Sequence, residues 1–259
     1  MPEGDTVHLT ARQQNAALAR QVLTGFELRV PEFATIDLSG ETVREVVARG
    51  KHLFHRIGEY SLHTHLKMEG AWRLFRPGER WTRPAFQARA VLTTAAAVAV
   101  GFELGITELV LTSDEDRAVG HLGPDLLGPD WDAAEAERRL TADSGSPVFV
   151  ALLDQRNLAG IGNVYANELC FLRGLLPTRP MADVPDVAAL VSLARRLLVA
   201  NADRWTRSTT GELRNGRTTW VYGRDGEPCR RCGTRLESGE LGRRAGEERH
   251  VTWCPYCQK

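Results

Sequence analysis

The chain has 259 residues, 42% of them apolar, and its 33 Lys and Arg residues balance 33 Asp and Glu residues. This length allows one large domain or two modest ones, and no apolar run approaches the roughly 20 residues needed to span a bilayer. The start, MPEGDTVHLT, lacks the basic and apolar regions of a signal peptide. We therefore expect a cytoplasmic protein without a membrane partner.

The charges are unevenly distributed along the chain. Residues 204–259 carry 12 Lys and Arg against 7 Asp and Glu, so the preceding part is acidic by the same margin. Only three lysines occur, Lys51, Lys67 and Lys259, beside many arginines. A basic terminal segment suits a partner that carries phosphates, and the alternative is an ordinary solvated basic face.

The first part of the chain predicts a helix followed by a sheet structure. Apolar residues recur at helical spacing over 6–23, and Gly25 is expected to end that helix. Eight short segments rich in β-branched residues follow, separated by Gly and Pro, which predicts a β-sandwich. The expected strands are 26–30, 42–48, 52–57, 61–66, 71–75, 87–93, 97–102 and 108–111.

Gly-Pro pairs at 123–124 and 128–129 indicate a linker. Beyond it the pattern favours helices over 131–140, 147–153, 164–173 and 187–202, whereas 204–217 is polar and is expected to be a mobile loop. The predicted domains are therefore 1–122, a linker at 123–131, a helical domain at 132–219 and a terminal metal module at 220–259. The fold class is α+β and multidomain.

Four of the five cysteines form two CxxC pairs. Cys229 and Cys232 are followed, after 21 residues, by Cys254 and Cys257. Four thiolates at such spacing predict one structural Zn²⁺ in a closed Cys₄ site on a zinc-finger hairpin. Four unliganded thiols would leave this short segment with little to hold it folded. The fifth cysteine, Cys170, is expected to be a buried apolar residue, and no organic cofactor is expected.

The segment LLDQRNLAGIGNVYANEL predicts a helix end, a glycine turn and a second helix that opens near Asn163. Free N–H groups at a helix N-terminus, with Gly162 allowing close approach, can bind a phosphate. Asn163 would add a side-chain donor. The alternative is a tight connection between two packed helices.

Pro2 and Glu3 stand where most chains are frayed and without function. Removal of Met1 would nevertheless leave Pro2 as a secondary amine. α-Amino groups titrate near pH 8, so part of the population is an unprotonated nucleophile at neutral pH. Such an amine can attack a sugar C1′, and the Glu3 carboxyl could move protons beside it.

Five segments together resemble the formamidopyrimidine-DNA glycosylase/endonuclease VIII family. They are PEGDTV, RGKHL at 49–53, HLKMEGAWRL at 65–74, LLDQRNLAGIGNVYANE, and VYGRDGEPCRRCGTRL with RHVTWCPYCQK. They lie in the family's order over nearly the whole chain. The resemblance implies an N-terminal helix on a β-sandwich, a helix–two-turn–helix domain and a C-terminal zinc finger.

The resemblance also implies roles for single residues. Pro2 would be the Schiff-base nucleophile, and Glu3 would assist opening of the deoxyribose. Lys51 would contact phosphates at the lesion and assist β-elimination. The protein would bind damaged double-stranded DNA, with single-stranded DNA as a further substrate. We expect a monomer associated with the nucleoid.

Four more residues are implied to hold the DNA. Asn163, with Gly162, would bind a phosphate beside the lesion, and Arg249 would bind phosphate from the finger and assist δ-elimination. Met68 falls where the family inserts an apolar side chain into the gap left by an everted nucleotide. Ordinary strand packing is the alternative for Met68.

One departure bears on the lesion. The purine-lesion branch has a D-x-R-x-F-G loop, but here Arg117 is followed by Ala118 and Val119 within TSDEDRAVGHLGPDLL. The start PEGDTV and Trp253 before Cys254 resemble the endonuclease VIII branch. The expected enzyme is thus a bifunctional DNA glycosylase/AP lyase that removes oxidised pyrimidines and cleaves by β,δ-elimination.

Two alternatives to that enzyme stay open: the same chemistry on oxidised purines, and a non-catalytic protein that binds damaged DNA. A generic zinc-ribbon binder would leave the PEG start and the Lys51 segment unexplained.

Overall fold

The computed structural model describes residues 2–259 and divides into two compact units, one ending at His121 and one spanning Leu122–Lys259. Each unit has its own apolar core. Among the described residues, no helix is long and apolar enough to cross a membrane. Met1, whose removal the sequence hypothesis requires, lies outside the described residues.

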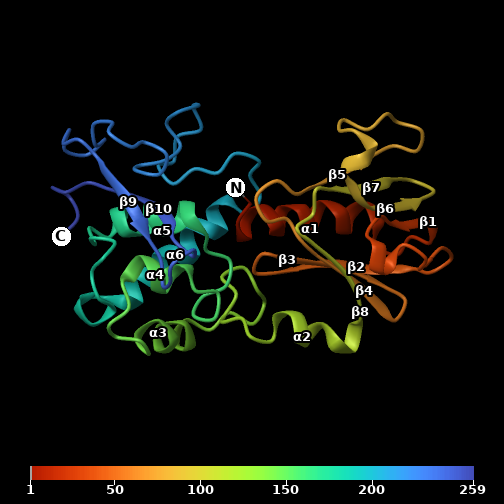
Figure 1. Ribbon diagram of the computed structural model, residues 1–259, viewed down its shortest axis with the longest axis horizontal. Coiled ribbons are helices and arrows are strands. Elements are labelled where there is room, and N and C mark those ends of the chain that lie inside the picture. Colours follow the sequence, from red (N-terminus) through yellow and green to blue (C-terminus); the bar gives the residue numbers. More distant parts are fainter. Residues whose placement is uncertain (1) are drawn as a thin grey trace. The chain divides into compact units, whose positions relative to one another are not determined.

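The first unit is a helix packed on a β-sandwich, as expected (Figure 1). One sheet has the order β1-β6-β7-β5 and the other β2-β3-β4-β8, with every pair antiparallel. The helix α1 (Gly4–Leu18) contacts β2 and β3. The strands are β1 (Leu23–Leu28), β2 (Val43–Arg49), β3 (His52–Ile57), β4 (Tyr60–His65), β5 (Ala71–Phe75), β6 (Ala88–Thr94), β7 (Val98–Phe102) and β8 (Ile106–Leu111).

The end of α1 differs from the expectation. The helix stops at Leu18, because Arg20 has a left-handed backbone with φ of 66°. Gly25 does not end a helix but lies within β1, opposite Thr93. A short helix that the sequence pattern did not predict, α2 (Glu115–Val119), follows β8.

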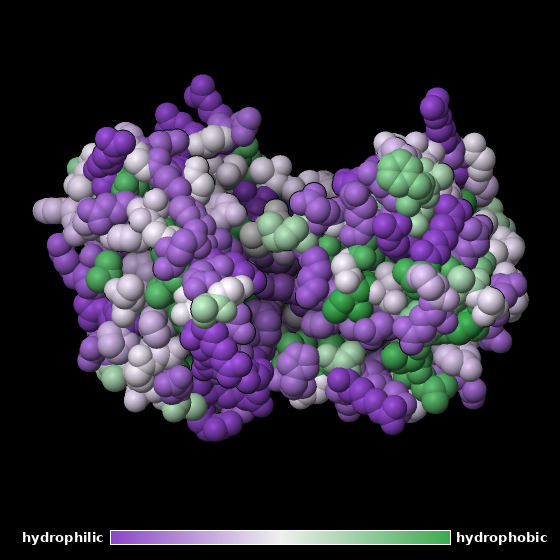
Figure 2. All heavy atoms as spheres, in the orientation of Figure 1, coloured by the Kyte–Doolittle hydropathy of each residue, from purple (hydrophilic) through white to green (hydrophobic). Residues whose placement is uncertain are grey.

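The second unit has four helices and one hairpin among its described residues. The helices are α3 (Ala133–Thr141), α4 (Val148–Leu153), α5 (Asn163–Leu172) and α6 (Val187–Asn201), and the hairpin pairs β9 (Glu237–Leu241) with β10 (Arg249–Trp253). Fully buried residues of α5, among them Tyr165 and Leu169, lie in the centre of its core. On the face drawn in Figure 2 hydrophilic side chains predominate over this unit.

Candidate active site and nucleic-acid interface

Hydrogen bonds fix the direction in which α1 runs along β2. The N–H of Val46 donates to the Asn15 Oδ1 at 2.8 Å, and the N–H of Arg20 donates to the Val43 carbonyl at 2.7 Å. The helix and the strand therefore run antiparallel, so that residues earlier in α1 lie beside residues later in β2. From Asn15 to Glu3 a helix rises about 18 Å, and from Val46 to Lys51 a strand spans about 17 Å.

The start of α1 therefore lies level with the β2–β3 turn. That turn carries Lys51, while Glu3 is fully buried and Pro2 is partly buried at the helix start. Glu3 and Lys51 both have interaction partners in the structure. Pro2, Glu3 and Lys51 therefore lie at the same end of the β2–β3 hairpin.

The turn between β4 and β5 begins at the same end of the sheet, because His65 pairs with His52 across β3 and β4. Lys67 has a left-handed backbone with φ of 52°, and its N–H donates to the His65 Nδ1 at 2.9 Å. Gly105 makes room for the Lys67 stem, because a Cβ there would lie 2.2 Å from the Lys67 Cγ. Met68 lies in this turn, 58% exposed, and is not packed in a strand.

Histidines beside Lys51 form a feature that the sequence pattern did not predict. His52 Nδ1 lies 2.8 Å from His63 Nε2, and His63 Nδ1 lies 3.3 Å from the Glu108 carboxylate. The His65 ring stands edge-on to His52. The sequence holds His63 and His65 two residues apart, but their proximity to His52 follows only from the register of β3 and β4.

These histidines are uncharged at neutral pH. Burial, reinforced by the neighbouring histidines and Lys67, lowers the pKa of His52 to about 3. Burial and the Lys67 and Lys51 ammonium groups lower the pKa of His65 to about 4. This end of the sheet therefore presents lysine charges beside neutral imidazoles. A neutral imidazole can donate one hydrogen bond and accept one without adding charge.

In the second unit α5 begins at Asn163, as expected, after a turn in which Gly160 has φ of 107°. The Asn163 side-chain amide donates to the His250 carbonyl of β10 at 3.0 Å. One turn later Asn167 Oδ1 accepts the Thr252 N–H at 2.7 Å. The hairpin is thus fastened to the first turns of α5, which places Arg249 next to the residue that bonds Asn163.

This arrangement is suited to an anion. An amide nitrogen carries two N–H groups, and within residues 2–259 the Asn163 amide has a protein acceptor for only one of them. The N-terminal end of the α5 dipole, which favours negative charge, adds to it. Arg249 is exposed, with its guanidinium donating to the carbonyls of Glu247 and Glu248.

His250 also holds the hairpin in place. Its ring contacts Asp225 through Nε2 and Glu240 through Nδ1, and Asp225 also accepts the Thr252 hydroxyl at 2.6 Å. Burial alone would lower the pKa of His250, but the bonds to the two carboxylates raise it overall. The cation so favoured binds the hairpin to the loop before the zinc ligands.

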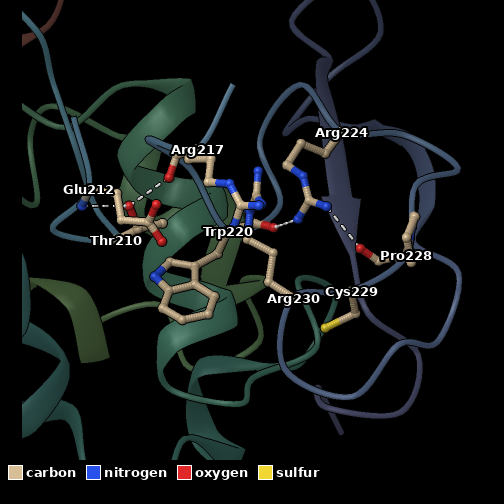
Figure 3. Close-up of a pocket in the computed structure, with 8 residues that line it drawn as sticks. All are labelled: Thr210, Glu212, Arg217, Trp220, Arg224, Pro228, Cys229 and Arg230. Atoms are coloured by element: carbon tan, nitrogen blue, oxygen red, sulfur yellow. Dashed lines mark hydrogen bonds between the residues drawn. The ribbon is translucent and has the colours of Figure 1, made fainter. Parts of the chain in front are cut away.

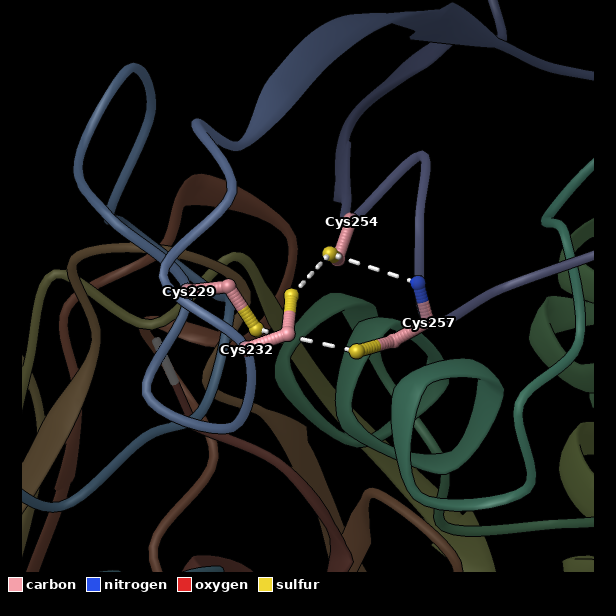
Figure 4. A group of neighbouring side chains, drawn as sticks. All are labelled: Cys229, Cys232, Cys254 and Cys257. Atoms are coloured by element: carbon pink, nitrogen blue, oxygen red, sulfur yellow. Dashed lines mark hydrogen bonds between the residues drawn. The ribbon is translucent and has the colours of Figure 1, made fainter.

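The four cysteine sulfurs converge on one point, two from each end of the module (Figure 4). All four lie within 4.8 Å of one another, with Cys232 and Cys254 3.5 Å apart and Cys229 and Cys257 4.0 Å apart. Sulfurs bound tetrahedrally at 2.3 Å from Zn²⁺ are about 3.8 Å apart. The donor set and spacing therefore fit the expected structural zinc.

The polar segment 204–217, expected to be a mobile loop, is held at Thr209 by a side chain that also holds residues 220–222, which follow it. Glu168, fully buried on α5, accepts the Thr209 hydroxyl and the N–H groups of Trp220, Val221 and Tyr222. Burial raises the pKa of this carboxyl, while the four donors act in the opposite direction. One carboxylate thus fixes the path from residue 209 to residue 222.

A pocket of about 380 Å³ lies between this segment and the zinc module (Figure 3). The guanidiniums of Arg224 and Arg230, which line it, donate to backbone carbonyls of Trp220, Pro228, Thr219 and Gly216. These arginines therefore bind the segment to the loop that holds Cys229 and Cys232. Elsewhere in this unit, Cys170 is buried in the core, as expected.

Comparison with known proteins agrees with this architecture. Residues 1–121 match the formamidopyrimidine-DNA glycosylase N-terminal domain, and residues 122–201 match the H2TH domain of the same family. The chain is 52% identical, over 100% of its length and 99% of the relative's, to the DNA-(apurinic or apyrimidinic site) lyase Nei2 of Mycolicibacterium smegmatis. It is also 52% identical to the probable endonuclease 8 2 of Streptomyces coelicolor, over 100% of this chain and 94% of the relative.

Among solved structures, the fold is similar to that of the Lactococcus lactis Fpg protein in complex with DNA that contains an abasic site. The TM-score is 0.83 at 24% identity, with 100% of each chain covered. The fold, the cysteine cluster and the two family domains lead to one assignment. The chain belongs to the formamidopyrimidine-DNA glycosylase/endonuclease VIII family of DNA glycosylase/AP lyases, on its endonuclease VIII branch.

Proposed function

We propose that the protein removes oxidised pyrimidines from DNA in the cytoplasm and cuts the strand through a Schiff base on Pro2. The observation that carries this proposal is the position of α1. Its start, with Pro2 and Glu3, lies level with the turn that holds Lys51. A nucleophilic amine, a carboxyl group and a phosphate-binding ammonium are the groups that the chemistry requires.

The Pro2 amine forms a bond to the sugar, and elimination then cuts the strand on both sides of the lesion. With Met1 removed, the Pro2 amine attacks C1′, the C1′–N bond breaks, and the base leaves with a proton while Glu3 assists ring opening. The resulting iminium loses a C2′ proton and the 3′ phosphate leaves. In δ-elimination, assisted by Arg249, a C4′ proton is lost and the 5′ phosphate leaves. Water then hydrolyses the iminium, which releases the sugar fragment as an unsaturated aldehyde, restores the Pro2 amine and leaves a one-nucleotide gap with phosphate ends.

The other predicted residues hold the DNA in this proposal. Lys51 in the first unit, and Asn163, Gly162 and Arg249 in the second, bind phosphates around the lesion. Met68 fills the gap left by the everted nucleotide, for which its exposure in a tight turn is suited. We also propose a linker at residues 123–131 and a boundary between the helical domain and the zinc finger at 219–220.

Oxidised pyrimidines are favoured over oxidised purines by the segment after β8. Where the purine branch has an Arg/Phe loop, this chain has the helix α2. Arg117 there pairs with Asp114 at 3.0 Å while remaining 82% exposed, and Ala118 and Val119 follow it where the loop of the purine branch has Phe. The relatives of the endonuclease 8 type support the same preference.

The test is borohydride trapping on duplexes that differ in one lesion. We expect covalent attachment to duplexes with an abasic site, 5-hydroxycytosine or dihydrouracil, and at least about tenfold slower attachment to one with 8-oxoguanine. Faster attachment to 8-oxoguanine would overturn the lesion preference. DNA binding without attachment to any of the four would instead favour a non-catalytic binding protein.

A further inference from the structure

Two short connections cross from one sheet of the sandwich to the other. The Met68 turn, residues 66–70, joins β4 to β5, and residues 103–105 join β7 to β8. The Gly105 N–H donates to the carbonyl of His65, the last residue of β4, at 2.9 Å, so the two connections are bonded to each other. Met68, which is 58% exposed, is thus displayed from a turn that is anchored where it begins.

Both connections contain a residue with a left-handed backbone. The φ angles are 52° at Lys67 and 49° at Glu103, and Arg20 is the only other such residue besides glycine in the part of the chain that the structure describes. Residues with a Cβ rarely adopt this conformation, so it persists only where surrounding contacts impose it. The shape of the Met68 turn therefore depends on contacts from outside the turn.

Arg83 supplies such a contact just after Met68. One guanidinium nitrogen, Nη1, donates to the Glu69 carbonyl at 3.3 Å and to the Glu103 carboxylate at 2.9 Å. The Glu103 N–H donates in turn to the Gln87 carbonyl at 2.8 Å, which fixes that end of the ion pair. Arg83 therefore joins the exposed part of the Met68 turn to the neighbouring connection.

The loop that carries Arg83 is itself packed on the sandwich. Trp81 stands edge-on to the fully buried Phe102, with ring centroids 6.0 Å apart, and the Arg83 guanidinium lies 6.0 Å from the centroid of the same Phe102 ring. Arg29 stands over the Trp81 ring and donates to the Ala85 carbonyl at 3.1 Å. Arg83 thus reaches the Met68 turn from a fixed base, whereas the bonds of Arg29 fix the loop itself.

We propose that Arg83 is a positioning residue that holds the Met68 turn ready to enter the base stack. This inference rests on the proposed function, in which Met68 fills the gap left by the everted nucleotide. A turn that becomes ordered only on binding costs free energy at that moment, whereas a turn that is already fixed does not. Arg83 touches no DNA in this proposal and acts only through Met68.

The test is a double-mutant cycle of Arg83→Ala and Met68→Ala, with Arg29→Ala as the matched control. Arg29 is similarly exposed, at 36% against 32% for Arg83, and it also pairs with a glutamate and donates to a backbone carbonyl. Single-turnover cleavage of a 5-hydroxycytosine duplex is measured with the protein below saturation. Because ordering a side chain and its turn is worth about tenfold in binding, Arg83→Ala should cleave about tenfold more slowly than the wild type.

The cycle separates an effect through Met68 from an independent one. In the Met68→Ala background, Arg83→Ala should slow cleavage by less than twofold, because the side chain that it positions is absent. Arg29→Ala should stay within twofold of the parent protein in both backgrounds. An equal tenfold loss from Arg83→Ala in both backgrounds would overturn the proposal, since Arg83 would then bind DNA or support the fold independently of Met68. A loss below twofold in the wild-type background would overturn it as well.

A second measurement reports the insertion itself. A 2-aminopurine placed opposite a tetrahydrofuran abasic analogue becomes more fluorescent when its stacking is disturbed. At saturating protein, Arg29→Ala should give the same increase as the wild type, whereas Arg83→Ala and Met68→Ala should each give less than half of it. A full increase from Arg83→Ala would contradict the positioning role.

The two proposals can fail separately. A half-exposed ion pair contributes little to stability, so Arg83→Ala should fold, and its melting curve checks this. Arg83→Gln, too short to reach both acceptors, carries the test if the alanine variant does not fold. Wild-type behaviour of Met68→Ala in both measurements would overturn the gap-filling role and this inference together. Failure of the wild type to cleave any duplex would refute the proposed enzyme, and the fluorescence measurement would still test Arg83.

Discussion

The two units present their functional groups in different ways. In the first unit, the alignment of α1 with β2 places Pro2, Glu3 and Lys51 at the same end of the β2–β3 hairpin, beside histidines that burial keeps neutral. In the second unit, side chains of α5 bond the hairpin and the segment before the zinc ligands directly. The difference suggests that the first unit carries the chemistry and the second is a cross-linked clamp.

The largest effect is expected from loss of the metal. Cys254→Ser removes one of four ligands, and because a zinc module folds through its metal, the hairpin that holds Arg249 should unfold. We expect no bound zinc and a fall in DNA affinity of about 100-fold. Zinc analysis and titration of labelled DNA measure both quantities. Cys170→Ala is the matched control, since Cys170 is no ligand, and full zinc occupancy in Cys254→Ser would refute the assignment.

Removal of the central acceptor of the second unit should have the next largest effect. Glu168→Gln places an amide where three backbone N–H groups donate, leaving buried donors unsatisfied. We expect about 3 kcal/mol of destabilisation. Peptide-resolved hydrogen exchange should become faster in residues 163–222 and should stay unchanged in the first unit. Unchanged protection of 209–222 would mean that Glu168 does not anchor this segment.

The stability of the two units should respond to acid in opposite directions. Burial lowers the pKa of the fully buried His55 to about 3. Between pH 6.5 and 3 the unfolded chain therefore binds a proton at His55 that the folded unit does not bind. The first unit should therefore lose stability as pH falls from 6.5 towards 3, by at most about 3 kcal/mol at pH 4 from His55.

The raised pKa of His250 works the other way. It contributes stability that is fully present below pH 6.5 and is lost as pH rises through the folded pKa. Peptide-resolved hydrogen exchange at pH 7 and pH 5, corrected for intrinsic rates, measures the contrast. Equal acid destabilisation of β3 and β10 would contradict it.

The smallest effects are expected at single phosphate contacts. Lys51→Ala and Arg249→Ala should each lower the slope of log affinity against log salt by about 0.9. Arg138→Ala is the control, because this exposed arginine of α3 pairs with Glu135 and is assigned no phosphate. Binding to an undamaged duplex at several salt concentrations gives the slopes, and a slope unchanged in Lys51→Ala would remove that residue from the phosphate contacts.

Local patterns predicted much of this molecule. The bounds of β3 and β5, the start of α5 at Asn163 and the cysteine cluster agree with the structure, because period-2 alternation, a glycine turn and CxxC spacing are local signals. The predicted end of α1 was wrong, because the left-handed backbone at Arg20 has no signature in the sequence. The anchoring of residues 209–222 by Glu168 and the pairing of His52 with His63 depend on tertiary contacts that periodicity does not carry.

The central claim is that the amine of Pro2 forms the bond to DNA. The direct measurement is to trap the protein with borohydride on an abasic duplex, digest it, and locate the sugar adduct by mass spectrometry. The adduct is expected on the peptide that begins at Pro2, with Met1 absent, and an extension that keeps a residue before Pro2 should lower trapping by at least about 1000-fold. An adduct on Lys51 or Lys67, or undiminished trapping by the extended protein, would contradict the account.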